Sequence, residues 1–79
     1  MGILGNISGK EAVKIFQKID YYVARQEGSH IVLVNDREGY PIIVIPDYKE
    51  VAPGLLRAQI KRAHLTVQEF LKIKRKGKL

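Results

Sequence analysis

The two histidines of this 79-residue sequence are its natural candidates for proton transfer, because imidazole is the side chain that titrates near neutral pH. His30 follows Gly28 and Ser29, so a strand that begins after this glycine turn would hold the imidazole at the edge of a sheet with its backbone fixed. His64 falls late in an expected helix, where a cation simply complements the helix dipole. Residue type alone favours a structural role over a catalytic one for both histidines.

Other residue patterns that support common chemistries are missing from the sequence. It contains no cysteine, which excludes disulfides, a thiolate nucleophile and Cys-based zinc sites. Residues 5–9 include two glycines but lack the Lys and Ser or Thr order of a phosphate-binding P-loop, and neither Ser8 nor Ser29 stands in a nucleophile-elbow motif. With no cluster of three or four metal ligands in the pattern either, we expect neither a metal nor another cofactor.

The positive charge of the chain is concentrated at its C-terminus. Lys and Arg number 14 against 8 acidic residues, and the last eight positions hold five of the basic residues and no acid. These five are Lys72, Lys74, Arg75, Lys76 and Lys78. We expect a single, nearly neutral domain over residues 1–71 and a basic tail over residues 72–79, which either contacts phosphate or keeps the chain soluble.

The sequence contains no segment that predicts a membrane span. Its longest unbroken aliphatic run covers residues 42–45, far short of the length that crosses a bilayer. The lack of cysteine fits a reducing compartment, so we expect a cytoplasmic protein without a membrane partner.

Local signals predict a helix followed by three strands. Ser8 and Glu11 have the spacing of a capping box, and apolar residues recur on one helical face from there to about Asp20. Aromatic and β-branched residues then predict strands over residues 21–26, 29–35 and 40–45. The connections contain Gly28 and Gly39 and are short, so the strands should form an antiparallel meander.

Two further helices are expected after the strands. Pro53 suits the first turn of a second helix, whose apolar face carries Leu56 and Ile60. Thr66 and Glu69 have the spacing of another capping box, which would start a short terminal helix. The predicted fold class is therefore α+β: a helix, a three-stranded antiparallel sheet and a second helix, with both helices on one face of the sheet and a short C-terminal helix.

Both faces of the predicted sheet are apolar. In the second strand Ile31 and Leu33 point to one face, whereas Val32 and Val34 point to the other, and the third strand repeats the pattern. The helices can cover only one of these faces. The sequence therefore predicts that a second copy of the chain or a protein partner covers the other.

Four stretches stand out by their order and spacing in the sequence. They are Ser8-Gly9-Lys10-Glu11, Arg25-Gln26-Glu27-Gly28-Ser29-His30, Pro53-Gly54-Leu55-Leu56-Arg57 and residues 65–71. Together they resemble the HicA (YcfA-like) toxin family, and the likeness covers residues 7–71. Its most specific part is the Arg-Gln-x-Gly-Ser-His run that ends at His30.

The resemblance implies a fold similar to a double-stranded RNA-binding domain, endoribonuclease activity on mRNA and a HicB-like antitoxin as partner. It also implies that His30 is the catalytic residue, acting either as a base on the 2′-hydroxyl or as an acid on the leaving 5′-oxygen. RNA supplies its own nucleophile, so one histidine with one or two cations can suffice without a metal. The candidate RNA contacts are Lys10, Arg25, Ser29, Arg57 and Lys61, although each charged one could equally be a solvated surface residue.

The sequence departs from the family pattern around the expected site. The position after the motif histidine, often a second histidine in the family, is Ile31. Asp47-Tyr48 stands where a histidine is common after the third strand, and the usual Gly-Thr of the second helix reads Gly54-Leu55. Fewer polar groups are therefore expected around His30.

Two other functions are compatible with the same fold. One is a non-catalytic module that binds single-stranded or structured RNA, and the other is a protein-interaction module built on the apolar sheet face. A binder of long RNA duplexes usually opens its second helix with clustered lysines, whereas residues 52–56 contain none. The sequence therefore argues against recognition of long duplexes.

Overall fold

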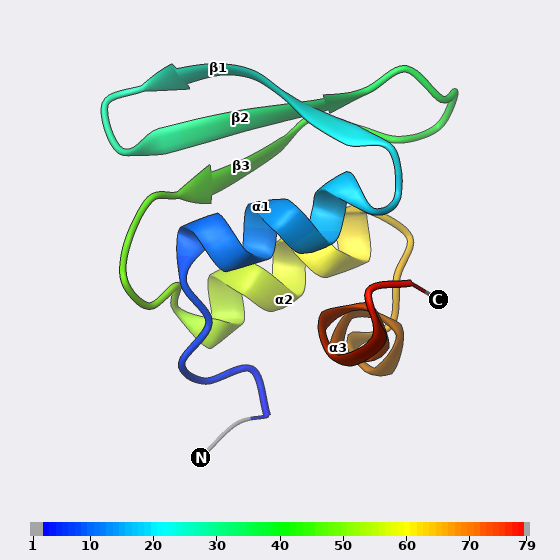
Figure 1. Ribbon diagram of the computed structural model, residues 1–79. Helices are drawn as coiled ribbons and strands as arrows, with labels where there is room; N and C mark the ends of the chain where they lie inside the picture. The colour runs from blue at the N-terminus through cyan, green and yellow to red at the C-terminus, as the bar shows by residue number, and fades with distance from the viewer. Residues whose placement is uncertain (1–2, 79) are drawn as a thin grey trace.

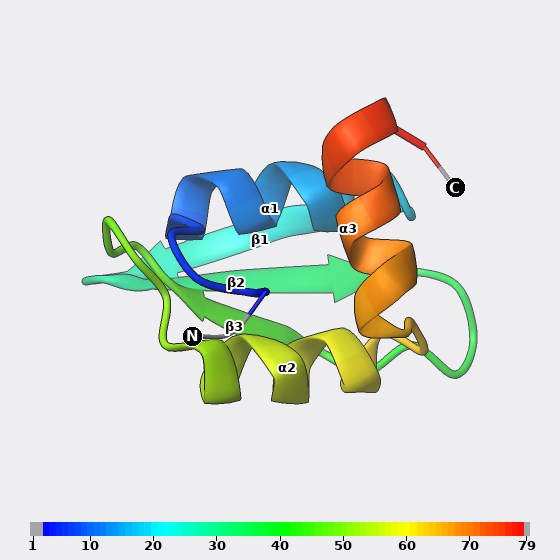
Figure 2. The ribbon, with the colours of Figure 1, turned by 90° about the horizontal axis from the view of Figure 1, so that it is seen from below.

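The computed structural model describes residues 3–78 and has three helices on one side of a three-stranded sheet (Figure 1). In chain order the elements are α1 (Gly9–Gln17), β1 (Tyr21–Glu27), β2 (His30–Asn35), β3 (Ile43–Pro46), α2 (Pro53–Arg62) and α3 (Val67–Lys76). Figure 2 shows α1 and α2 side by side across the sheet, and α3 packs against both of them. The predicted α+β class and the placement of both main helices on one face are confirmed.

The sheet is an antiparallel meander with β2 in its centre. Residues alternate along β2, so Ile31 and Leu33 are buried under the helices, as are Ile43 and Ile45 on β3. The register between β1 and β2 shifts between Val23 and Arg25, an irregularity that the sequence pattern did not predict.

The α1 helix begins as predicted but ends earlier. The Ser8 Oγ accepts a hydrogen bond from the Glu11 backbone N–H at 3.0 Å, which caps the helix. The return half of the expected capping box is not among the hydrogen bonds of residues 3–78; the Glu11 carboxylate lies 3.5 Å from the Lys74 Nζ on α3 instead. The helix ends at Gln17, and Asp20 closes the following turn with a φ of 76°.

The third strand begins at Ile43 rather than at residue 40, and the carbonyls of the two residues before it bond to side chains. The Tyr21 hydroxyl donates to the Pro41 carbonyl at 2.9 Å, and the Arg62 guanidinium donates to the Ile42 carbonyl at 3.0 Å. On the same free edge of β3, the Val44 N–H donates to the Gln59 Oε1 at 3.2 Å. Side chains of α2 thus occupy backbone groups that another strand could otherwise bind.

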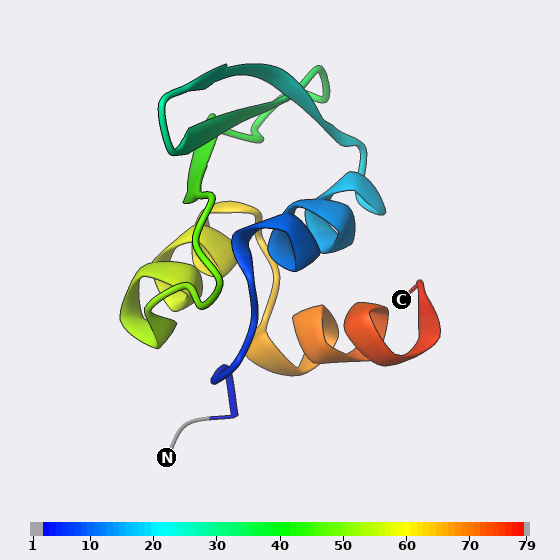
Figure 3. The ribbon, with the colours of Figure 1, turned by 60° about the vertical axis from the view of Figure 1, so that its left-hand side comes forward.

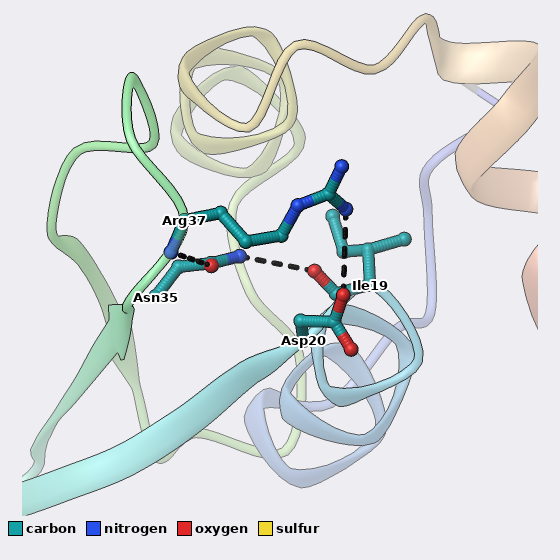
Figure 4. A network of polar contacts seen from close by, with 4 residues as sticks. All are labelled: Ile19, Asp20, Asn35 and Arg37. Carbon is teal, nitrogen blue, oxygen red and sulfur yellow. Dashed lines mark hydrogen bonds and ion pairs between the residues drawn. The ribbon is translucent and has the colours of Figure 1, made fainter.

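A small polar network joins the end of α1 to the end of β2 (Figure 4). Asn35 is the only buried polar residue within residues 3–78. Its Nδ2 donates to the Ile19 carbonyl at 3.0 Å, and its Oδ1 accepts from the Arg37 N–H at 2.8 Å. The Arg37 guanidinium also reaches Asp20, with 3.3 Å between Nη1 and Oδ2. These bonds fix the two ends together although the residues lie far apart in the sequence.

The expected basic tail is wrong in one respect: residues 72–76 are part of α3. The predicted cap of this helix is confirmed, since Thr66 and Glu69 form a complete capping box. The helix continues to Lys76 because Ile73 is buried beneath it, one turn after the buried Phe70, and Gly77 ends it in the left-handed conformation with a φ of 78°. The lysines of this region are therefore held at fixed positions around a helix.

The face of the sheet opposite the helices is apolar over part of its area, as the sequence predicted. No helix within residues 3–78 covers it, as Figure 3 shows from the side. Val44, Ile42 and Tyr22 are exposed, whereas Val32 in the centre is buried by its neighbours. Coverage of this face by a second copy or a protein partner stays a prediction.

Candidate active site

His30 is the first residue of β2 and lies on the face of the sheet that the helices leave open. It follows a two-residue turn in which only Gly28 has a positive φ, 62°, the pattern of a type II′ hairpin. His30 pairs across the turn with Glu27 on β1 and on its other side with Pro46 on β3. The backbone of an exposed histidine is thus fixed from both sides.

The two histidines differ in what their rings contact. The His64 Nε2 lies 2.6 Å from the Gly39 carbonyl, and its ring meets the Tyr40 ring edge to face with 5.0 Å between centroids. Because a carbonyl only accepts, that nitrogen must carry the proton. The exposed His30 imidazole has no hydrogen bond or ion pair to another residue in the described part of the chain. His64 has a structural role, and His30 is left available to a ligand.

The start of α1 lies close to the end of β3 at the same end of the molecule as His30 (Figure 2). The Gly9 N–H donates to the Tyr48 carbonyl at 2.9 Å, and the Asp47 N–H donates to the Ser29 carbonyl at 2.6 Å. Ser8 and Lys10 then share a small cavity of about 210 Å³ with Asp47, Tyr48 and Lys49. Through the Asp47 to Ser29 bond, this cavity adjoins the turn that carries His30.

Arg25 lies two residues before Glu27 on the same strand, and its Nε is 2.6 Å from the Glu27 Oε2. Both side chains are more than half exposed, so this ion pair contributes at most about 1 kcal/mol and can be exchanged for another anion. The two terminal guanidinium nitrogens have no hydrogen bond within the described residues. Arg25 can therefore present them to a phosphate beside the His30 hairpin.

The candidate RNA contacts fall into two groups. Lys10, Arg25 and Ser29 lie at the His30 end of the molecule. Lys61, in contrast, lines an open cavity with Tyr40 and His64 at the other end of the sheet. The length of β2 separates the two ends by roughly 17 Å, at about 3.3 Å per residue. Arg57 lies one turn before Lys61 on α2, so a contact of either residue with RNA at His30 would need a longer RNA.

Sequence reasoning missed two acidic groups near His30. Glu27 is its cross-strand partner, and a two-residue turn always pairs its flanking residues, so this signal was present in the sequence. Asp47 accepts a hydrogen bond from the Gln26 Nε2 at 3.3 Å. Because Gln26 pairs with the buried Ile31, this contact lies on the helix side of the hairpin, opposite the His30 side chain. Its approach depends on how β3 ends and could not be predicted locally.

Residues that could hold a metal do not gather in the described chain. Among residues 3–78 no three side chains of His, Cys, Asp or Glu lie close enough to share an ion. Within the same residues, no helix has the length and apolar character needed to cross a membrane.

Comparison with known protein families matches residues 9–65 to the family described as HicA toxin of bacterial toxin-antitoxin. The match extends from the first residue of α1 to beyond α2 and includes the whole sheet and His30. Searches of curated proteins and of solved structures found no significant match. The family match covers more than two thirds of the chain, so this protein belongs to the HicA toxin family and has the role of the toxin in a toxin-antitoxin pair.

Proposed function

We propose that this toxin is a metal-independent endoribonuclease that cleaves mRNA, with His30 as its general acid or base. The observation that supports this most directly is the contrast between the histidines: the imidazole of His64 is engaged by Gly39 and Tyr40, whereas that of His30 is exposed on a fixed backbone. Membership of the toxin family adds to it.

The reaction needs only groups that RNA and this hairpin can provide. The ribose 2′-oxygen attacks the adjacent phosphorus, so a P–O2′ bond forms while the P–O5′ bond breaks. A base takes the 2′-hydroxyl proton and an acid returns a proton to the 5′-oxygen, which leaves a cyclic phosphate and a free 5′-hydroxyl. His30 performs one of these two proton transfers, and solvent water performs the other.

Cations beside the hairpin stabilise the charge that builds up on the phosphate. Arg25 reaches the site from β1, and its exchange of Glu27 for phosphate costs little because that ion pair is exposed. Lys10 lies at the start of α1 at the same end of the sheet, where it lines the cavity that contains Asp47. Ser29 supplies a hydroxyl in the turn itself. These are the contacts we propose for the scissile phosphate.

The test compares two histidine variants on one RNA. His30→Ala should lower the cleavage rate at least about a hundredfold, the usual contribution of general acid or base catalysis. Its unfolding free energy should change by less than about 0.5 kcal/mol, because the side chain is exposed and makes no bond. Binding to 2′-O-methyl RNA, which lacks the nucleophile, should stay within a few fold of the unsubstituted protein.

His64→Ala is the matched control. It removes the bond to Gly39 and the contact with Tyr40, so it should lower the unfolding free energy by about 1–2 kcal/mol. Cleavage by this variant should remain normal at temperatures where it is folded. Full cleavage by His30→Ala, or a loss no larger than its unfolded fraction, would rule out His30 as the catalyst and favour a non-catalytic RNA-binding module.

We also propose a HicB-like antitoxin as the protein partner of this toxin, on the strength of the family membership. Expression of the toxin alone should arrest growth, and coexpression with an antitoxin encoded beside it should restore growth. If growth arrest persists during coexpression while the two proteins fail to copurify, the proposed pairing is wrong.

A further inference from the structure

A basic groove runs between α1 and α3, away from the hairpin that carries His30. It has a volume of about 440 Å³, and its walls carry Lys10 and Lys14 from α1, Lys18 directly after that helix, and Lys74 from α3. Among residues 3–78, the only acidic residue in the lining is Glu11, which lies 3.5 Å from Lys74. Four lysines against one carboxylate leave a net charge of +3 in the groove.

The α1 lysines form a regular row. They recur every fourth residue, so they lie on one side of the helix, about 6 Å apart along its axis. All three are exposed, and within residues 3–78 none of them has an ion-pair partner. An evenly repeated row of uncompensated positive charge suits a ligand whose negative charges also repeat, such as a nucleic acid backbone.

The lining favours phosphate over a protein surface. Ile15 and Ile73 form the apolar part of the groove, and both are buried, so they offer little area for an apolar anchor. No aromatic side chain lines the groove, so bases cannot stack there. Contact with the sugar-phosphate backbone of RNA is the chemistry that remains.

One end of the groove lies at the same end of the molecule as the candidate active site. Ser8 and Lys10 line both the groove and the smaller cavity that contains Asp47. The Asp47 N–H in turn donates to the Ser29 carbonyl next to His30. The His30 side chain lies on the opposite face of the sheet, so a strand of RNA that leaves the hairpin would pass around the end of the sheet at Ser29 and Asp47 before it meets Lys10 and continues along Lys14 and Lys18.

We propose that the α1/α3 groove binds the phosphate backbone of single-stranded RNA that extends from the cleavage site. The inference rests on the proposed function, because RNA is the ligand in both. It assigns Lys14 and Lys18 as RNA contacts, and it distinguishes the α3 lysine that lines the groove from those on the other side of that helix. Lys74 faces the groove, whereas Lys72 and Lys76 lie on the opposite side of that helix and are absent from its lining.

The first test measures binding of a 2′-O-methyl RNA 20-mer as a function of salt, by fluorescence anisotropy. Lys14→Gln together with Lys18→Gln should flatten the slope of log affinity against log salt by about 1.4, at roughly 0.7 per lost contact. That change corresponds to a loss of affinity of about 25-fold at 0.1 M salt. The pair Lys72→Gln and Lys76→Gln, with the same spacing and charge change, should leave the slope within about 0.3 of the unsubstituted value. Equal slopes for the two pairs would overturn the proposal.

A second variant tests the groove by gain rather than loss. Glu11→Gln removes the only carboxylate of the lining and frees Lys74, so affinity for the same RNA should rise about fivefold at 0.1 M salt. Unchanged or weaker RNA binding by a folded Glu11→Gln protein would contradict the proposal that RNA binds in the groove. Polyglutamate of equal charge should displace the RNA poorly, and equal potency would overturn the RNA assignment in favour of an acidic protein.

Cleavage then separates this proposal from the proposed function. The Lys14 and Lys18 variant should cleave a five-nucleotide RNA at the normal rate but lose at least tenfold in kcat/KM on the 20-mer. If the unsubstituted protein binds RNA in the groove but cleaves neither the five-nucleotide RNA nor the 20-mer, the proposed function is wrong and the proposal that the groove binds RNA is supported. If it cleaves both and the variant cleaves both equally well, the groove fails and the proposed function stands.

Discussion

Substitution of Gly9 by alanine tests how closely α1 must approach the sheet. Gly9 is the first residue of α1, and a Cβ added to it would lie 2.0 Å from the Pro46 carbonyl oxygen and 3.0 Å from the Asp47 Cα. Both contacts are to backbone, so no side chain can rotate out of the way. The φ of Gly9 is not in the left-handed region, and close packing alone requires a glycine here.

The magnitude follows from the size of this clash. An ordinary carbon to oxygen contact is about 3.3–3.6 Å, so the start of α1 must move away by more than about 1 Å. Overpacking of this kind costs about 1–3 kcal/mol, and loss of the 2.9 Å bond from the Gly9 N–H to Tyr48 adds about 1 kcal/mol. The lower entropy of the unfolded alanine chain returns only about 0.4–1 kcal/mol. The net expected loss in unfolding free energy is about 1–3.6 kcal/mol.

Gly54→Ala provides the matched control, because Gly54 also lies in the first turn of a helix. An added Cβ there meets no atom within 4 Å, and its φ is not positive. This variant should gain about 0.4–1 kcal/mol. Thermal and urea unfolding would measure both, with Gly9→Ala melting at least about 4 °C lower than the unsubstituted protein.

A Gly9→Ala protein as stable as Gly54→Ala would refute the reasoning about the close approach. The variant also probes the site, since movement of α1 displaces Ser8 and Lys10 from Asp47. RNA cleavage by Gly9→Ala, measured well below its melting temperature, should therefore fall while that of Gly54→Ala does not.

Two further predictions concern stability. Asn35→Ala should lower the unfolding free energy by about 1–3 kcal/mol, because it leaves the Ile19 carbonyl and the Arg37 N–H without their partner. Urea unfolding with an unchanged m-value would measure this loss, and a loss below about 0.5 kcal/mol would contradict the prediction. Burial raises the pKa of Tyr21 above its ordinary value of 10.0, and the hydrogen bond to Asp36 raises the pKa of Tyr22 above the same value. The unfolded chain therefore releases these two protons at a lower pH than the folded protein does. As a result, the unfolding free energy should fall as the pH rises through about 10. Tyr22→Phe should make that fall shallower, and an unchanged pH profile would count against it.

Much of the fold follows from short-range signals in the sequence. Caps at Ser8 and Thr66 start their helices, and Gly28 permits the hairpin turn that places His30 at the start of a strand. Alternation along β2 predicts which residues share a face of the sheet. These interactions act over at most four residues, so the sequence contains them in full.

Packing between distant segments decided the rest. The burial of Ile73 extends α3 to Lys76, and the Glu11 carboxylate pairs with Lys74 rather than with its own helix cap. The side chains of α2 occupy backbone groups on the free edge of β3 and just before it. None of these contacts has a local signature, because each depends on which elements come to lie side by side.

The site shows the same division. By itself the sequence determined that His30 follows a hairpin turn, and it identified Lys10 and Arg25 as nearby cations. Only the tertiary structure placed Lys61 at the far end of the sheet and aligned the α1 lysines with Lys74 to form a groove. The physical reason is that a helix fixes which of its own residues share a face, while the packing of its apolar side fixes what that face lies against.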